Sequence, residues 1–258
     1  MAEIDKHKLK VLGVIPARGG SKTIPRKNII PFAGKPLIAW TIECALEGQV
    51  AASMVLSTDD PEIAHVGEKF GVQVPFIRPP DLAKDETPTA PVVQHALRLM
   101  EKKNNQEYEY IIILEPTSPA RRPEHIRGAM QLLVETGADS VSGISEVPHH
   151  YSSQKILKKN AENLITGIND TPISDMIHRR QDLPVEYAFN GIVWACRAEL
   201  LRNKKPSIWG KRNLGFVIDP KYAIDLDILL DWEIGELRMQ KILAEEPEFN
   251  NRDLDNDI

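Results

Sequence analysis

The stretch GVIPARGGSKTIPRKN, residues 13–28, decides the fold class predicted for this chain. It opens with apolar residues that, together with Val11 and Leu12, are typical of a buried strand, and it then turns into a basic loop with two glycines. Ligands of parallel α/β sheets bind at the carboxyl ends of the strands, where the chain turns into a loop or helix. The stretch therefore predicts a strand that carries a ligand-binding loop to the edge of such a sheet.

The composition of this loop favours an anionic ligand. Gly19 and Gly20 allow the backbone to approach a ligand closely, and Ser21 adds a hydroxyl group. Arg18, Lys22 and Lys27 add positive charge, and successive backbone amides can form an anion-binding nest. A triphosphate fits these groups, although the Walker spacing GxxxxGK[ST] is absent. A tight turn with basic side chains in solvent is the alternative interpretation.

Strand-like and helix-like segments alternate beyond the loop. Helical patterns cover residues 34–48, 61–70, 87–103, 122–137 and the second half of 222–245; strand patterns cover residues 53–60, 110–116, 140–147 and 187–196. Residues 110–116 form a continuous apolar run, which is typical of a central parallel strand. The alternation predicts an α/β fold around a mostly parallel sheet.

The alternation breaks after Val147. Residues 148–186 are polar, with weak strand-like pieces, and we expect them to form a small inserted arm that packs on another subunit. The core is then expected to comprise residues 9–147 and 187–244. Residues 245–258 are acidic and poor in apolar groups, so a disordered tail is expected there.

The overall composition is that of a soluble globular protein of enzyme size. The 258 residues are 42% hydrophobic and 27% charged, with a formal net charge of −5. A negative net charge argues against a nucleic-acid surface and leaves local basic clusters as sites for small anions. Cys44 and Cys196 lack metal-ligand spacing and are expected to be buried free thiols. The charged N-terminus and the lack of an apolar run near the ~20 residues that span a bilayer predict a cytoplasmic protein without membrane contact.

A pair of carboxylates near the C-terminus is the second candidate for chemistry. In the segment AIDLDI, Asp225 and Asp227 are two residues apart, so on a strand they would point to one face. Two carboxylates on one face repel unless a cation lies between them, and Mg²⁺ accepts carboxylates together with phosphate oxygens. An acidic strand end that caps the following helix is the alternative interpretation.

Six segments occur in the order found in one enzyme family. IPARGGSKTIPRKNIIPFAGKPLIAWTI, STDDPEIA, ILEPTSPAR, RRQDLP, FNGIVW and AIDLDILLD together resemble the acylneuraminate cytidylyltransferases, the CMP-sialic acid synthetases and their relatives for legionaminic and similar nine-carbon acids. The resemblance runs from about Val11 to the C-terminal helix. It implies a Rossmann-like nucleotidyltransferase fold, a homodimer, and Mg²⁺-dependent transfer from CTP to a 2-keto-3-deoxy nine-carbon sugar acid with release of pyrophosphate.

The resemblance also implies roles for individual residues. The implied nucleotide-binding residues are Arg18, Gly19, Gly20, Ser21, Lys22, Lys27, Asn28 and Arg78. Arg18 and Lys22 would contact the triphosphate, Asp225 and Asp227 would hold Mg²⁺, and these four residues form the implied catalytic set. Glu115, Arg180 and Asn190 would lie on the side of the sugar, with Arg180 on the dimerisation arm and reaching into the partner's site.

Two positions depart from the family pattern. Glu115 stands where relatives commonly have Gln, and a carboxylate there disfavours an acidic sugar unless it pairs with a cation or accepts hydrogen bonds from hydroxyl or amine groups. Thr23 stands where relatives often have Gly, and threonine resists positive φ. Two alternative functions stay open. In these alternatives the chain is either a nucleotidyltransferase that acts on a sugar 1-phosphate or uses another nucleotide, or a catalytically inactive relative that binds a nucleotide.

Overall fold

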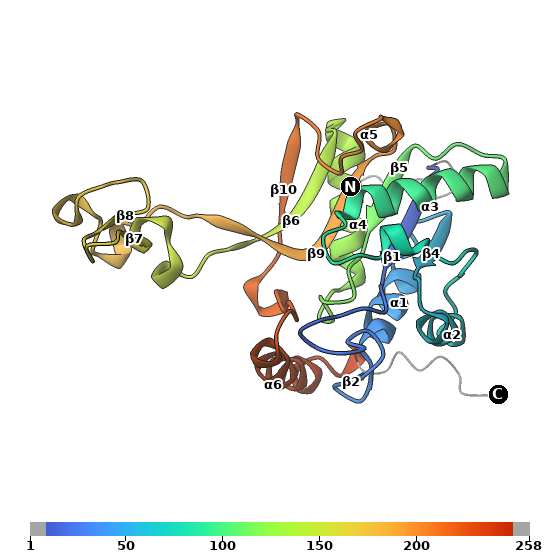
Figure 1. Ribbon diagram of the computed structural model, residues 1–258, viewed down its shortest axis with the longest axis horizontal. Coiled ribbons are helices and arrows are strands. Elements are labelled where there is room, and N and C mark those ends of the chain that lie inside the picture. The colour runs from blue at the N-terminus through green and yellow to red at the C-terminus, as the bar shows by residue number, and fades with distance from the viewer. Residues whose placement is uncertain (1–8, 250–258) are drawn as a thin grey trace.

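The computed structural model describes residues 9–249 and has a six-stranded central sheet in the order β10-β6-β9-β5-β1-β4 (Figure 1). The strands are β1 (Val11–Pro16), β4 (Ser53–Ser57), β5 (Tyr110–Ile113), β6 (Ser140–Glu146), β9 (Tyr187–Arg197) and β10 (Asn213–Val217). β9 runs antiparallel to its neighbours β5 and β6, whereas the pairs β1–β4, β1–β5 and β6–β10 are parallel. The predicted α/β fold with a mostly parallel sheet is therefore confirmed.

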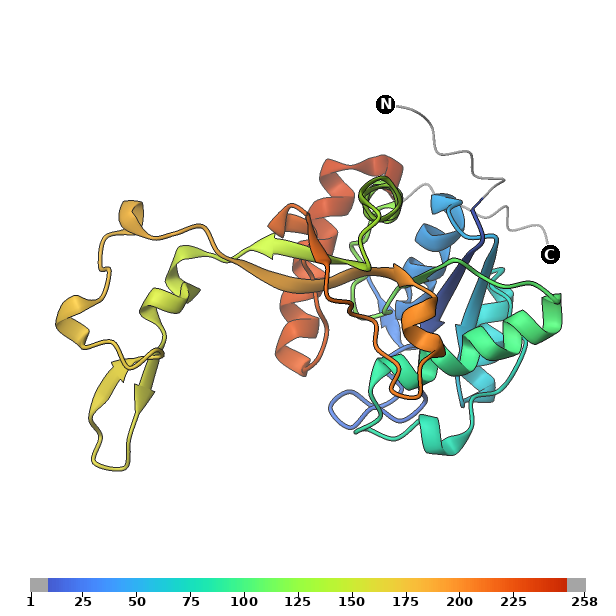
Figure 2. The same ribbon diagram turned by 90° about the horizontal axis from the view of Figure 1, so that it is seen from above.

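Helices cover both faces of this sheet (Figures 1 and 2). They are α1 (Leu37–Gly48), α2 (Pro61–Lys69), α3 (Thr89–Asn104), α4 (Pro123–Thr136), α5 (Glu199–Arg202) and α6 (Leu229–Glu245). One buried apolar cluster joins residues of α1, α2 and α4 to the sheet, and a second joins residues of α3 and α5 to its other face. A third cluster packs α6 against α1 and the hairpin of β2 (Pro31–Phe32) and β3 (Lys35–Pro36).

β1 lies inside the sheet, and its position explains its composition. Val11, Leu12, Val14 and Ile15 are all fully buried because helices cover both faces at this strand. Its partners β4 and β5 run in the same direction, so the carboxyl ends of all three strands meet at one edge. The basic loop that follows β1 consequently lies beside the segments that follow β4 and β5.

Local signals set several helix ends. The Asp60 side chain accepts hydrogen bonds from the backbone amides of Glu62 and Ile63 and so caps α2, and Gly137 ends α4 in the left-handed conformation. The helical pattern was predicted from residue 87, but α3 begins at Thr89 after Pro88. The Thr87 hydroxyl donates to the carbonyl oxygen of Asp81.

Residues 148–186 project from the body between β6 and β9 (Figure 1). The projection contains a small hairpin of β7 (Leu157–Lys159) and β8 (Ile165–Gly167) and four short 3₁₀ helices, η2 (His149–Tyr151), η3 (Ser153–Lys155), η4 (Ile173–Asp175) and η5 (Arg180–Asp182). At its base, the amide of Val147 donates to the carbonyl oxygen of Glu186. The Glu186 carboxylate accepts hydrogen bonds from Ser152 and Ser153, which fixes the start of the arm.

The chain after β10 differs from expectation in two places. Residues 223–228 are an extended loop and not a strand; the 3₁₀ helix η6 (Pro220–Tyr222) precedes them and α6 follows. The start of the expected acidic tail is ordered, because η7 (Pro247–Phe249) follows α6 and Phe249 is fully buried. The Phe249 ring stacks on Trp40, with ring centroids 5.8 Å apart. The rest of the expected tail lies outside the described residues.

Two further expectations can be compared with residues 9–249. Cys44 and Cys196 are both buried, as expected. None of the helices in this part of the chain is long and apolar enough to cross a membrane.

Candidate active site

A pocket of about 240 Å³ lies at the sheet edge where β1 and β5 end. It is lined by Pro16, Arg18, Lys27, Asn28, Glu115, Pro116, Thr117, Asp225 and Asp227. Three segments far apart in the sequence meet here: the basic loop, the residues after β5 and the extended loop before α6. The pocket thus brings together both groups of residues that the sequence singled out.

The backbone of the basic loop is held from two sides. The Gly19 amide donates to Asp59 Oδ1 at 3.0 Å, and Asn28 Nδ2 donates to the Arg18 carbonyl oxygen at 3.0 Å. A Cβ atom at Gly19 would lie 2.7 Å from Asp60 Oδ2, so only glycine fits there, whereas a Cβ at Gly20 would meet nothing within 4 Å. Gly19 therefore serves packing, and Gly20 leaves open space beside the loop.

Carboxylates from neighbouring segments neutralise the cations of this loop. Arg18 Nη1 and Lys22 Nζ each lie 2.5 Å from an oxygen of Asp85, and Arg26 Nη2 lies 2.7 Å from Glu62 Oε2. The hydrogen bond to Asp85 raises the pKa of Lys22, and the same bond holds the pKa of Asp85 below its usual value. These three basic side chains are thus each paired with a nearby carboxylate.

Hydrogen bonds join the basic loop directly to the extended loop before α6. Lys27 Nζ donates to the Leu226 carbonyl oxygen at 2.6 Å and lies 3.5 Å from Asp227 Oδ1. The Thr23 hydroxyl donates to the Asp227 carbonyl oxygen at 2.6 Å. Arg26, at φ 57°, takes the left-handed conformation in the loop, and Thr23 does not. Threonine at position 23 is therefore unstrained and adds a link to the acidic segment.

Asp225 and Asp227 keep the expected alternation although they are not on a strand. Ile224, which precedes Asp225, and Leu226, which lies between the two aspartates, are buried, whereas both aspartates line the pocket. The Leu226 amide donates to the Thr117 carbonyl oxygen at 3.1 Å, which holds the segment beside the end of β5. Burial raises the pKa of Asp225, and the charge of Asp227 raises it further. The two carboxylates therefore repel each other in the absence of a cation.

Glu115 lies deeper in the same pocket, just after β5. Burial raises its pKa, the charge of Asp225 adds to this rise, and a hydrogen bond with Trp194 opposes it. Gly191, at φ 69°, forms the facing surface: a Cβ atom there would lie 3.8 Å from Glu115 Oε2 and 3.9 Å from Asp225 Oδ2. Glu115 and Asp225 thus face one small space over Gly191.

Arg121 holds the backbone of Glu115 in place, and this role was not predicted from the sequence. Its side chain is fully buried and donates to the carbonyl oxygens of Glu115 (2.7 Å) and Ile192 and to the Thr41 hydroxyl (2.8 Å). Burial lowers its pKa to about 10. Arg121 therefore joins the residues after β5 to β9 and α1. Its place in the PTSPAR segment was the available signal.

Seven expected site residues do not line the pocket: four of the basic loop, Gly19, Gly20, Ser21 and Lys22, and three from other segments, Arg78, Asn190 and Arg180. Arg78 is buried at 4% exposure and donates from Nε to the Ser57 hydroxyl at 3.1 Å and from Nη2 to the Ser57 carbonyl oxygen. Asn190 is also buried; its amide group donates to the Ser145 hydroxyl and accepts from the Ile192 amide. Arg180 is exposed on the projecting arm. Their predicted roles stay predictions.

The carboxylates of the pocket suit a hard divalent cation that keeps other ligands. Within residues 9–249, no group of three or more His, Cys, Asp or Glu side chains is arranged to hold a metal ion. Mg²⁺ commonly binds through one or two carboxylates together with water and substrate phosphates. The pair Asp225 and Asp227 fits that pattern, and a cation there would relieve the repulsion between them.

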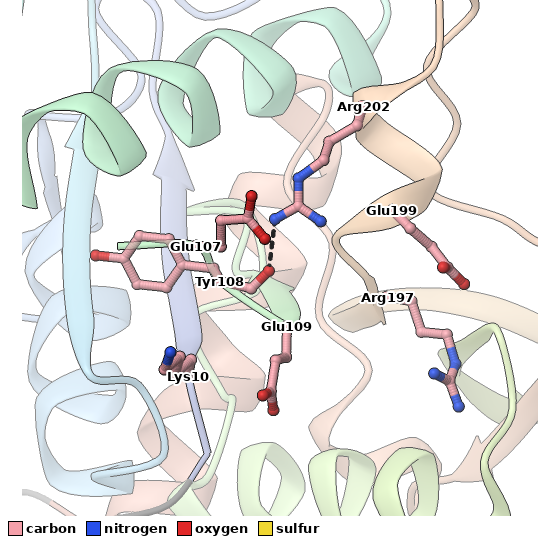
Figure 3. Close-up of a pocket in the computed structure, with 7 residues that line it drawn as sticks. All are labelled: Lys10, Glu107, Tyr108, Glu109, Arg197, Glu199 and Arg202. Carbon is pink, nitrogen blue, oxygen red and sulfur yellow. Dashed lines mark hydrogen bonds between the residues drawn. The ribbon is translucent and has the colours of Figure 1, made fainter. Parts of the chain in front are cut away.

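A second pocket of about 280 Å³ lies at the opposite edge of the sheet, around the start of β1 and β5 (Figure 3). It is lined by Lys10, Glu107, Tyr108, Glu109, Arg197, Glu199 and Arg202. Arg197 donates to the carbonyl oxygens of Gly137 and Ala138, and Arg202 donates to that of Tyr108 at 2.7 Å. Both arginines hydrogen-bond to backbone carbonyl oxygens at the ends of strands and helices. We therefore interpret their role in this pocket as structural.

Comparisons with known proteins identify the family that this chain resembles. The family model for cytidylyltransferases matches residues 12–237. The chain is 34% identical over 243 residues to the CMP-N,N'-diacetyllegionaminic acid synthase of Legionella pneumophila, covering 90% of this chain and 97% of that protein. It is 31% identical to the pseudaminic acid cytidylyltransferase of Campylobacter jejuni, covering 89% and 96%. It is 32% identical to N-acylneuraminate cytidylyltransferase A of Danio rerio, of which it spans 50%.

A solved structure shares the fold. The CMP:2-keto-3-deoxy-manno-octonic acid synthetase complexed with CTP superimposes with a TM-score of 0.65 at 18% identity, covering 90% of this chain and 99% of the other. At this identity, the likeness shows the fold alone.

Proposed function

The chain belongs to the cytidylyltransferase family, and we propose that it joins CTP to a 2-keto-3-deoxy nine-carbon sugar acid with release of pyrophosphate. The observation that carries the proposal is the pocket that combines Arg18, Lys27 and Asn28 with Asp225 and Asp227. Two relatives of similar length are named for N,N'-diacetyllegionaminic acid and pseudaminic acid, which supports an acceptor of this class.

In this reaction the anomeric hydroxyl oxygen attacks the α-phosphorus of CTP and gives up its proton to water. The bond between the α-phosphorus and the oxygen that bridges to the β-phosphorus breaks, and pyrophosphate leaves with that oxygen. We assign Arg18 and Lys22 to the polyphosphate, where their charges stabilise the negative charge that grows on the leaving pyrophosphate. Asn28 fixes the Arg18 backbone, and Lys27 bridges the loop to the acidic segment.

We assign Asp225 and Asp227 to Mg²⁺. When bound, the ion supplies Lewis-acid stabilisation of phosphate oxygens. The two carboxylates would hold it in the pocket, where Lys27 of the basic loop lies 3.5 Å from Asp227 Oδ1. Glu115, beyond Asp225, is assigned to the sugar, where its carboxylate accepts hydrogen bonds from hydroxyl or amide groups.

The assignment is tested by pyrophosphate release with Mg²⁺, crossing CTP, UTP, GTP and ATP against neuraminic, legionaminic and pseudaminic acids, octulosonate and hexosamine 1-phosphates. Release with CTP and a nine-carbon acid is expected. Release with a sugar 1-phosphate or another nucleotide would replace the substrate assignment, and CTP binding without release for any acceptor would identify an inactive relative.

The metal assignment is tested with Asp225→Asn. We expect kcat to fall more than about 100-fold, as for loss of a group that stabilises transition-state charge, with the melting temperature retained. Glu233→Gln removes an exposed carboxylate of α6 and serves as the matched control. Full activity of Asp225→Asn would contradict the metal assignment.

We also propose that the core, residues 9–147 and 187–244, dimerises through the arm of residues 148–186. The arm exposes large apolar side chains, including Tyr151 at 65%, Leu164 at 63% and Val185 at 63%. Exposed apolar surface of this kind is unfavourable in water and favours burial against a second copy. In such a dimer, Arg180 reaches the partner's site.

Mixing two inactive variants tests this arrangement. If Arg180 acts in the partner's site, a dimer of one Arg180→Ala subunit and one Asp225→Asn subunit has one intact site and one site with both defects. Equal mixing after subunit exchange should then restore about a quarter of wild-type activity, by random pairing. If Arg180 acts in its own subunit, no activity returns.

A further inference from the structure

Asp85 holds the two cations assigned to the polyphosphate. Its Oδ1 lies 2.5 Å from Arg18 Nη1 and its Oδ2 lies 2.5 Å from Lys22 Nζ. The two oxygens of one carboxylate thus bridge both basic groups, as two oxygens of a phosphate group would. The family resemblance that implied roles for Arg18 and Lys22 implied none for Asp85.

Asp85 lies in the segment that joins α2 to α3. Within this segment, the Arg78 amide donates to the Thr58 carbonyl oxygen at 2.7 Å, and the 3₁₀ helix η1 (Pro80–Leu82) follows. Residues 84–86 are exposed. Rearranging this part of the segment therefore disturbs little buried structure.

We propose that Asp85 is a positioning residue that holds Arg18 and Lys22 in place in the empty site and is displaced by the polyphosphate of the nucleotide. The proposal rests on the proposed function, since it takes these two residues as polyphosphate ligands. Phosphate oxygens accept hydrogen bonds from the same donors, and a carboxylate and a phosphate cannot share them without strong like-charge repulsion. Binding therefore exchanges one anion for another and frees residues 84–86 from the basic loop.

This exchange has a consequence for affinity. Part of the attraction between the polyphosphate and the loop is used to break the two ion pairs of Asp85. A variant without the competing charge binds CTP more tightly, whereas loss of a merely structural residue would weaken binding. Because both pairs are at least partly exposed, the gain is modest and shrinks as salt screens it.

The test compares CTP and cytidine binding to Asp85→Asn by calorimetry at low and high salt. We expect the Kd for CTP to fall about three- to tenfold at low salt, the gain to shrink at high salt, and the Kd for cytidine to stay unchanged. Asp85→Glu, which keeps the charge, should resemble the wild type. Asp81→Asn is the matched control, because Asp81 lies in the same segment and pairs with Lys84 at 3.3 Å.

Unchanged or weaker CTP binding by Asp85→Asn would overturn the proposal. Arg18→Ala separates this failure from failure of the proposed function. If Arg18→Ala weakens CTP binding but Asp85→Asn does not tighten it, only the role of Asp85 is refuted. If Arg18→Ala leaves CTP binding unchanged, the polyphosphate assignment itself is refuted, and the role of Asp85 with it.

Discussion

Replacing Arg121 by methionine should cost much more stability than a typical substitution. Its guanidinium is fully buried and supplies hydrogen bonds to three acceptors: the carbonyl oxygens of Glu115 and Ile192 and the Thr41 hydroxyl. Methionine fills similar volume but donates to none of them. A buried acceptor without a donor costs about 1–3 kcal/mol, and the apolar contacts of methionine offset part of the sum. We therefore expect Arg121→Met to lose about 3–5 kcal/mol of unfolding free energy.

Chemical denaturation and thermal melting measure this loss. For a chain of this size, 1 kcal/mol shifts the melting temperature by about 2–4 °C, so the expected fall is about 10 °C. Arg197→Met is the matched control, because Arg197 also donates to two backbone carbonyls but is partly exposed (Figure 3), so water can replace its bonds. We expect a loss below about 1 kcal/mol there. Equal losses in the two variants, or a fall under 3 °C for Arg121→Met, would refute the reasoning.

Two further changes test the pocket and the pH dependence of folding. Gly191→Ala should lower kcat/KM more than about tenfold, because its Cβ enters the space between Glu115 and Asp225 at a positive φ that costs about 1–2 kcal/mol. Gly34→Ala has the same backbone strain with nothing within 4 Å of the Cβ, and steady-state rates that fall equally in both would contradict crowding. Burial lowers the pKa of His125 from 6.5 to about 4, so the unfolded chain binds a proton that the folded protein excludes, and stability should fall by up to about 3 kcal/mol as the pH drops from 6.5 to 4. His125→Gln should flatten this fall in urea titrations, and an unchanged pH profile would exclude the mechanism.

The local elements of the fold were predictable because their signals are local. The apolar run of β1, the cap and proline that start α2, and the glycine that ends α4 each act over a few residues. The antiparallel direction of β9 was not predictable, because a buried strand has the same composition in either direction. Phe249 lies in an acidic stretch whose composition favours disorder, and only its contact with Trp40 orders it.

The residue types of the candidate site were predictable from the sequence, but most of the contacts between them were not. Residue types alone indicated the side chains that could bind phosphate and metal, because charge and glycine content are read directly from the sequence: the basic loop after β1 and the aspartates at 225 and 227. The contacts of the site became visible in the folded chain alone: Thr23 and Lys27 hydrogen-bond the loop to the acidic segment, Arg121 donates to the Glu115 carbonyl oxygen, and Asp85 pairs with Arg18 and Lys22. Arg121 and Glu115 are only six residues apart, but the other contacts join segments tens to hundreds of residues apart. Their partners are selected by the order and direction of the strands, which no short stretch of sequence encodes.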